Sequence, residues 1–109
     1  MRLESKLVIH YLRKHSHDDS LGVELECLAK AGSQPTIVWH RSDDGQYFKP
    51  ISSSTDVIIH ESSPNSYRRR SILIARHLTF SSDTIFVCEA EDVVHGGRVS
   101  KTLTIPKRK

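Results

Sequence analysis

The sequence has two cysteines, Cys27 and Cys88, and a single tryptophan, Trp39, which follows the first cysteine by twelve positions. All three lie in segments where apolar and polar residues alternate, and this period of two indicates β-strands that bury one face. Because no Cys-x-x-Cys pair is present, the cysteines suit one disulfide better than a zinc site, which needs four ligands. A disulfide indicates an oxidising compartment, whereas free thiols would favour an intracellular protein.

The chain has 109 residues, of which 37% are hydrophobic, and this is enough for one compact domain with a single core. We expect residues 6–105 to form that domain, residues 1–5 to be a linker or expression start, and residues 106–109 to be a basic tail or linker. Direct membrane insertion is not expected, since no segment approaches the roughly 20 apolar residues of a membrane span. The first residues also lack the apolar core of a signal peptide, so an extracellular protein with this sequence is expected to be an excerpt of a larger chain.

Turn signals separate several short segments along the chain. Breaks are expected at Pro35 and around Gly45, because proline interrupts strands and glycine tolerates positive φ. Residues 46–48 are expected to form a short strand that Pro50 ends. The expected strands are residues 6–12, 21–29, 36–41, 46–48, 56–60, 67–75, 84–90 and 98–105. With no helical period anywhere, this pattern predicts an all-β fold of two antiparallel sheets packed as a sandwich.

The region around the second cysteine follows a family pattern. The positions of Leu-x-Ile-x-x-Leu-x-x-x-Asp-x-Gly-x-Tyr-x-Cys are occupied, in order, by Leu73, Ala75, Leu78, Ser82, Thr84, Phe86 and Cys88. The residues from Cys88 to Asp92 are similar to a Cys-x-Ala-x-Asn strand ending. On these motifs the chain resembles, over residues 6–105, the immunoglobulin superfamily and in particular its I-set.

The resemblance implies an immunoglobulin-like β-sandwich in which a Cys27–Cys88 disulfide joins the two sheets and Trp39 fills the space beside it. The core residues that it implies are Trp39, Leu73, Leu78 and Phe86.

Three positions depart from the family pattern, since Ser82 replaces an aspartate, Thr84 a glycine and Phe86 a tyrosine. Phe86 fills the same core volume as a tyrosine. The corner hydrogen bond of the tyrosine hydroxyl, worth about 1 kcal/mol, is expected to be missing.

The resemblance also implies a function in protein recognition, in a cell-surface receptor, adhesion protein or secreted matrix protein. No catalytic motif or cofactor loop appears, so neither an enzyme nor a bound cofactor is expected. The expected binding surface is the outer side of the sheet that contains Trp39 and Cys88, extended by the loop between the last two strands, where apolar residues would face solvent. Its expected residues are Val38, His40, Tyr47, Ile85, Val87, Val93, Val94 and Arg98. The partner is expected to be another protein, with a weak homodimer as a further arrangement.

Basic residues suggest a second binding function. The expected cluster consists of Lys30, Arg68, Arg69 and Arg70. Such a cluster would bind a glycosaminoglycan such as heparan sulfate, because arginine matches the geometry of sulfate groups, and the alternative is a solvated charged face. Nucleic acid is not expected as a partner, since the net charge is only +3 and thirteen acidic residues are interspersed with the basic ones.

Two further alternatives remain open. His15 and His17, followed by Asp18 and Asp19, have the residue types of a metal site, but a solvated loop is the favoured interpretation and no metal is expected. The same fold would also serve as a structural spacer in an intracellular cytoskeletal array. Free thiols at the two cysteines would favour that spacer.

Overall fold

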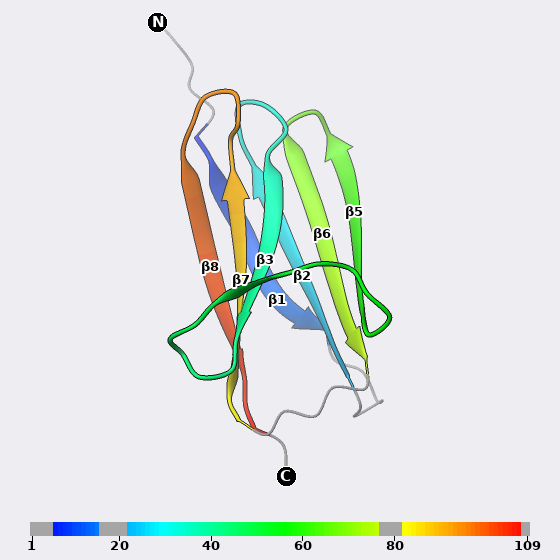
Figure 1. The fold of residues 1–109 in the computed structure, drawn as a ribbon. Coiled ribbons are helices and arrows are strands. Elements are labelled where there is room, and N and C mark those ends of the chain that lie inside the picture. The colour runs from blue at the N-terminus through cyan, green and yellow to red at the C-terminus, as the bar shows by residue number, and fades with distance from the viewer. Residues whose placement is uncertain (1–5, 16–21, 77–81, 108–109) are drawn as a thin grey trace, which may run out of the picture.

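The computed structural model describes residues 6–15, 22–76 and 82–107, and its fold is drawn in Figure 1. It contains eight strands: β1 (Val8–His15), β2 (Gly22–Lys30), β3 (Thr36–Ser42), β4 (Lys49–Ile51), β5 (Val57–Asn65), β6 (Arg68–Arg76), β7 (Thr84–Glu91) and β8 (Arg98–Ile105). Within the described residues, no helix has the length and apolarity that a membrane span requires.

The strands form two four-stranded antiparallel sheets, with the orders β1-β2-β6-β5 and β4-β3-β7-β8. The predicted all-β sandwich is therefore confirmed. Each sheet takes strands from both halves of the chain, and Figure 1 shows the two layers facing each other. The loops β2–β3 and β7–β8 and the turn between β5 and β6 lie together at one end of the sandwich.

The predicted short strand is displaced by a few residues. Residues 47–48 are not in a strand, and β4 instead runs through Pro50. Asp44 Oδ1 accepts hydrogen bonds from the backbone N–H groups of Gln46 and Tyr47, with N···O distances of 2.8 and 2.9 Å. These bonds prolong the turn. Proline is tolerated in β4 because this strand is the edge of its sheet, where a missing N–H costs little.

The strand expected at residues 56–60 is longer in the structure, where β5 runs from Val57 to Asn65. Strand β5 continues to Asn65 through a shift in register after Ser62, so Pro64 does not end it. The turn itself is formed by Ser66 and Tyr67. As in β4, the proline lies on an edge strand, where its missing N–H need not donate a hydrogen bond to a neighbouring strand.

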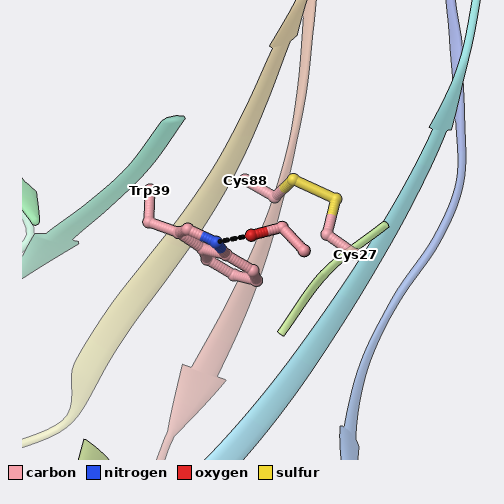
Figure 2. The surroundings of a disulfide bond; sticks show 4 residues. Cys27, Trp39 and Cys88 are labelled. Atoms are coloured by element: carbon pink, nitrogen blue, oxygen red, sulfur yellow. Dashed lines mark hydrogen bonds between the residues drawn. A yellow bond between two sulfur atoms is a disulfide. The ribbon is translucent and has the colours of Figure 1, made fainter. Parts of the chain in front are cut away.

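The core lies between the sheets and follows the predicted alternation. Its buried residues are Ile9, Val23, Leu25, Cys27, Ala29, Ile37, Trp39, Leu73, Ala75, Phe86, Cys88, Ala90 and Ile105. The Cys27–Cys88 disulfide joins β2 to β7, and the indole of Trp39 lies beside it, as Figure 2 shows. The disulfide prediction is thus confirmed, while Leu78 lies outside the described residues.

The corner at which the family pattern has a tyrosine is occupied here by Phe86 and has its own polar contacts. Phe86 is buried without a hydroxyl, while Thr84 Oγ1 lies 3.4 Å from Asp43 Oδ1. Ser82 Oγ donates to the backbone oxygen of Asp43 at 2.9 Å. Two of the departures from the family pattern, Ser82 just before β7 and Thr84 at its start, therefore contact Asp43 in the β3–β4 connection.

Candidate protein-recognition surface

The outer side of the β4-β3-β7-β8 sheet carries a band of apolar and uncharged side chains. The register places His40 opposite Val87, Val87 opposite Thr102, and Ile85 opposite Thr104. Val38 lies on the same side and is 42% exposed, whereas His40, Ile85 and Val87 are half-buried. We call these six residues the β3–β7–β8 face, and it contains four of the side chains expected there from the sequence.

Charged residues of β7 adjoin the β3–β7–β8 face, and Glu89 lies directly opposite Val38. His40 Nε2 lies 3.6 Å from Glu89 Oε1, and Arg98 Nε lies 3.3 Å from Glu91 Oε2. Protein interfaces have a similar plan, because their centre is poor in charged residues and their rim is polar. The predicted Arg98 therefore lies at the border of the face, with its charge balanced by Glu91.

The β7–β8 loop, residues 92–97, is organised by one buried carboxylate. Asp92, whose side chain is 2% exposed, accepts the backbone N–H groups of Val94 and His95 through Oδ1 at 3.1 and 3.0 Å. Ser33 Oγ of the β2–β3 loop donates to the same oxygen at 3.0 Å. The backbone of Asp92 also accepts from Gly96 N at 2.7 Å, with Gly96 at a positive φ of 82° that favours glycine.

The surroundings of Asp92 favour its charged form. The backbone N–H of His95 lowers the pKa of this carboxyl most strongly. Burial acts in the opposite direction, and the side chains of Ser33 and His95 lower the pKa further. The carboxylate is therefore ionised at neutral pH, where it holds the loop in one conformation.

This loop presents two adjacent valines to solvent. Val93 is 65% exposed and Val94 is 73% exposed. Neither side chain belongs to the core, while the backbone beneath them is held by Asp92. The result is an apolar tip on a preformed loop, next to the β2–β3 loop at the end of the sandwich (Figure 1).

The structure does not bring Tyr47 to this region. Tyr47 is 75% exposed and lies in the β3–β4 connection. The register pairs the start of β3, Thr36, with Glu91 next to the β7–β8 loop, so the far end of β3 and Tyr47 lie at the opposite end of the sandwich. Tyr47 is therefore distant from Val93 and Val94, and it does not continue their apolar surface.

The three consecutive arginines do not form one cluster, because successive residues of β6 point to opposite sides of the sheet. Arg69 points toward the sandwich interior, where Nε donates to Pro35 O at 2.9 Å and Nη1 lies 2.8 Å from Glu61 Oε1. Arg68 and Arg70 lie on the outer side, opposite Lys30 and Leu28. The sequence run therefore contains two outward-facing arginines and one that links neighbouring segments.

Sequence reasoning missed a charged group on the outer side of β2. The side chain of Glu26 is only 8% exposed. Its oxygens accept a hydrogen bond from the Tyr11 hydroxyl and lie 2.6 Å from His15 Nε2, 3.5 Å from Arg13 Nη2 and 3.2 Å from Arg70 Nε. The contact with Arg70 is an ion pair without hydrogen-bond alignment.

Burial and charge act in opposite directions on the pKa of Glu26. Burial raises it, but the hydrogen bonds of Tyr11 and His15 and the charge of Arg13 lower it more, so that the pKa lies below its usual range. The Tyr11 pKa is raised, mainly by burial and also by its bond to Glu26. Only the pairing of β1 with β2 and of β2 with β6 brings these side chains together, and the sequence does not give that register.

Most residues of the metal-site alternative lie outside the part of the chain that the structure describes. His15 contacts Glu26, whereas His17, Asp18 and Asp19 lie outside the described part of the chain. Among the side chains that the structure describes, no three His, Cys, Asp or Glu residues are grouped so that they would hold a metal ion.

No protein-family model matches the chain, and no curated protein matches it in sequence. Among solved structures, the chain is similar to domain C3 of the IgNAR antibody, with 17% identity over 94% of this chain and 98% of that one and a TM-score of 0.64. It is also similar to the ZP-N1 domain of ZP1, solved as a homodimer in work on egg coat filament cross-linking, with 14% identity, coverage of 90% and 100%, and a TM-score of 0.44. The antibody domain shows the fold of this chain, which is an immunoglobulin-like β-sandwich.

Proposed function

We propose that this chain is an extracellular I-set immunoglobulin-like domain that recognises another protein, as part of a larger receptor, adhesion protein or matrix protein. The observation that carries the proposal is the β7–β8 loop, where a buried carboxylate holds the backbone while Val93 and Val94 remain in solvent. The Cys27–Cys88 disulfide supports an oxidising compartment. The role is recognition and involves no catalysis.

Two exposed valines on a fixed loop are well suited to binding. Complete burial of a valine side chain contributes on the order of 1.5 kcal/mol or more, so the two together supply a useful part of a binding free energy. A flexible loop would lose conformational entropy when it binds. A loop that Asp92 and Ser33 already hold avoids most of this loss.

The β3–β7–β8 face would form the second half of the interface. Val38, Ile85 and Val87 provide apolar area in the sheet whose last two strands carry the loop. Glu89, which contacts His40, and Glu91, which pairs with Arg98, would form part of the polar rim. A partner would therefore contact the loop tip and the adjoining sheet together.

The test begins with a binding screen of the multimerised domain against a panel of extracellular proteins. Affinity for each binder is then measured for the wild type and for two double variants, Val93→Ser with Val94→Ser and Ile85→Lys with Val87→Lys. Tyr47→Ser is the matched control, because Tyr47 is equally exposed but lies at the other end of the domain. We expect the double variants to lose at least tenfold in affinity and the control to bind as the wild type does.

Correct folding is checked by thermal unfolding of each variant. A specific partner that binds all the folded variants equally well would contradict this surface. Loss of binding in Tyr47→Ser alone would instead assign recognition to the opposite end of the domain.

A further inference from the structure

Two cations face each other on the outer side of the other sheet. Lys30 of β2 and Arg68 of β6 are directly opposite in the register. Like charges in this position destabilise a sheet, because their side chains are only about 5 Å apart at Cβ. No ion pair in the described part of the chain includes either residue.

The other arginines with described side chains are all paired with acids. Their partners are Glu26 for Arg13 and Arg70, Asp43 for Arg41, Glu61 for Arg69 and Glu91 for Arg98. Arg68 differs from all of these, and its nearest charged neighbour across the strands is Lys30. The repulsion between Lys30 and Arg68 is therefore not compensated within the described domain.

Arg70 extends this pair along the same side of β6. It follows Arg68 by two residues, which places the two side chains about 7 Å apart along the strand. Arg70 shares its acidic partner, Glu26, with Arg13, so that one carboxylate balances two guanidinium groups. Lys30, Arg68 and Arg70 thus form a bent row of positive charge, which runs across the strands from Lys30 to Arg68 and along β6 to Arg70, and we call it the β2–β6 basic row.

The two outer faces of the sandwich differ in charge. Among the described side chains at outward strand positions, the β1-β2-β6-β5 sheet carries Arg13, Lys30, Arg68 and Arg70 against Glu24 and Glu26. The outward positions of β7 and β8 carry Glu89 and Glu91 against Arg98. An anionic ligand is therefore attracted to the first face and not to the β3–β7–β8 face.

We propose that the β2–β6 basic row is a binding site for a linear sulfated polysaccharide of the glycosaminoglycan class. Guanidinium groups match the geometry of sulfate, and a chain with repeated sulfates contacts the whole row at once. This regular repeat of anions along one chain favours the polysaccharide over a folded acidic protein, whose surface carboxylates have no such repeat. Arg69, although part of the same sequence run, takes no part because it is bonded to Glu61 and Pro35.

The test measures affinity for a size-defined heparin oligosaccharide at 150 mM NaCl. The wild type is compared with Lys30→Gln/Arg68→Gln and with a control, Lys49→Gln/Lys101→Gln. The control removes the same charge from exposed lysines of β4 and β8, which belong to the other sheet. We expect at least a tenfold loss for the first variant, less than a twofold change for the control, and affinity that falls steeply with salt in the wild type.

Thermal unfolding separates binding from folding in this experiment. Because the first variant relieves repulsion between Lys30 and Arg68, its Tm is expected to be no lower than that of the wild type. No binding of heparin by the wild type, or equal losses in both variants, would overturn the proposal. Competition by polyglutamate as effective as that by heparin would overturn it as well, in favour of an acidic protein partner.

Discussion

Trp39 Nε1 donates a hydrogen bond to Ser71 Oγ at 2.8 Å, and both side chains are buried between the sheets. The bond joins β3 to β6 and so connects the two sheets at a second point, close to the disulfide (Figure 2). Ser71→Ala is expected to lower the free energy of unfolding by about 2 kcal/mol, because the indole N–H would remain buried without an acceptor. Urea denaturation at pH 7 measures this loss.

A double-mutant cycle with Trp39→Phe isolates the contribution of that bond. Phenylalanine has no N–H to satisfy, so Ser71→Ala is expected to cost much less in the Trp39→Phe background. The same cost in both backgrounds would show that Ser71 stabilises the core by packing alone.

The disulfide closes a loop with a sequence separation of 61. From the chain entropy of a loop of this length, Cys27→Ala/Cys88→Ala is expected to lower the unfolding free energy by about 4 kcal/mol. In the wild type, alkylation of the unreduced, denatured protein is expected to label no cysteine. Two labelled thiols in protein made under oxidising conditions would instead favour the intracellular spacer.

Glu26 balances the charges of Arg13 and Arg70 while it is itself nearly buried. Glu26→Gln is expected to lower the unfolding free energy by about 2 kcal/mol, because hydrogen bonds to a charged group are lost and both arginines lose their partner. Glu89→Gln, which removes a surface contact with His40, is expected to cost less than about 1 kcal/mol. Equal costs in urea denaturation would mean that burial gives Glu26 no special role.

Asp92 makes the stability of the domain depend on pH. Its pKa in the folded state lies below the unfolded value of about 3.9, so its stabilisation is present at neutral pH and is lost as the pH falls through the folded pKa. Asp92→Asn has no carboxyl to titrate, and its unfolding free energy is expected to fall less than that of the wild type between pH 7 and pH 3. Other acids such as Glu26 titrate in both proteins and cancel in this comparison, so parallel pH curves would contradict the role of Asp92.

The sequence predicted those parts of the fold that depend on a period of two. The alternation of apolar and polar residues around Cys27, Trp39 and Cys88 indicates which side of each strand is buried. The same alternation correctly predicted that Val38 and Val87 lie on the outer side of their sheet. The same rule separates Arg69 from Arg68 and Arg70, although three adjacent arginines look like one cluster in the sequence.

The contacts of Glu26 required information that the sequence does not contain. They depend on which residue of β1 lies opposite which residue of β2, and a bulge between Ile9 and Tyr11 shifts that register by one residue. The position of Tyr47 was missed for a similar reason, because Asp44 prolongs the turn through local hydrogen bonds and moves the edge strand to Lys49.

In the β7–β8 loop, the residues that fix the backbone conformation differ from the residues that face solvent at the tip. The loop conformation depends on one carboxylate, on a serine of the neighbouring loop and on glycine at positions 96 and 97, whereas the side chains of Val93 and Val94 contribute nothing to the hydrogen bonds that fix it. Both valines can therefore be exchanged for other residues while the turn remains intact. The domain is accordingly suited to serve as a scaffold on which new binding specificities are selected by randomising two codons.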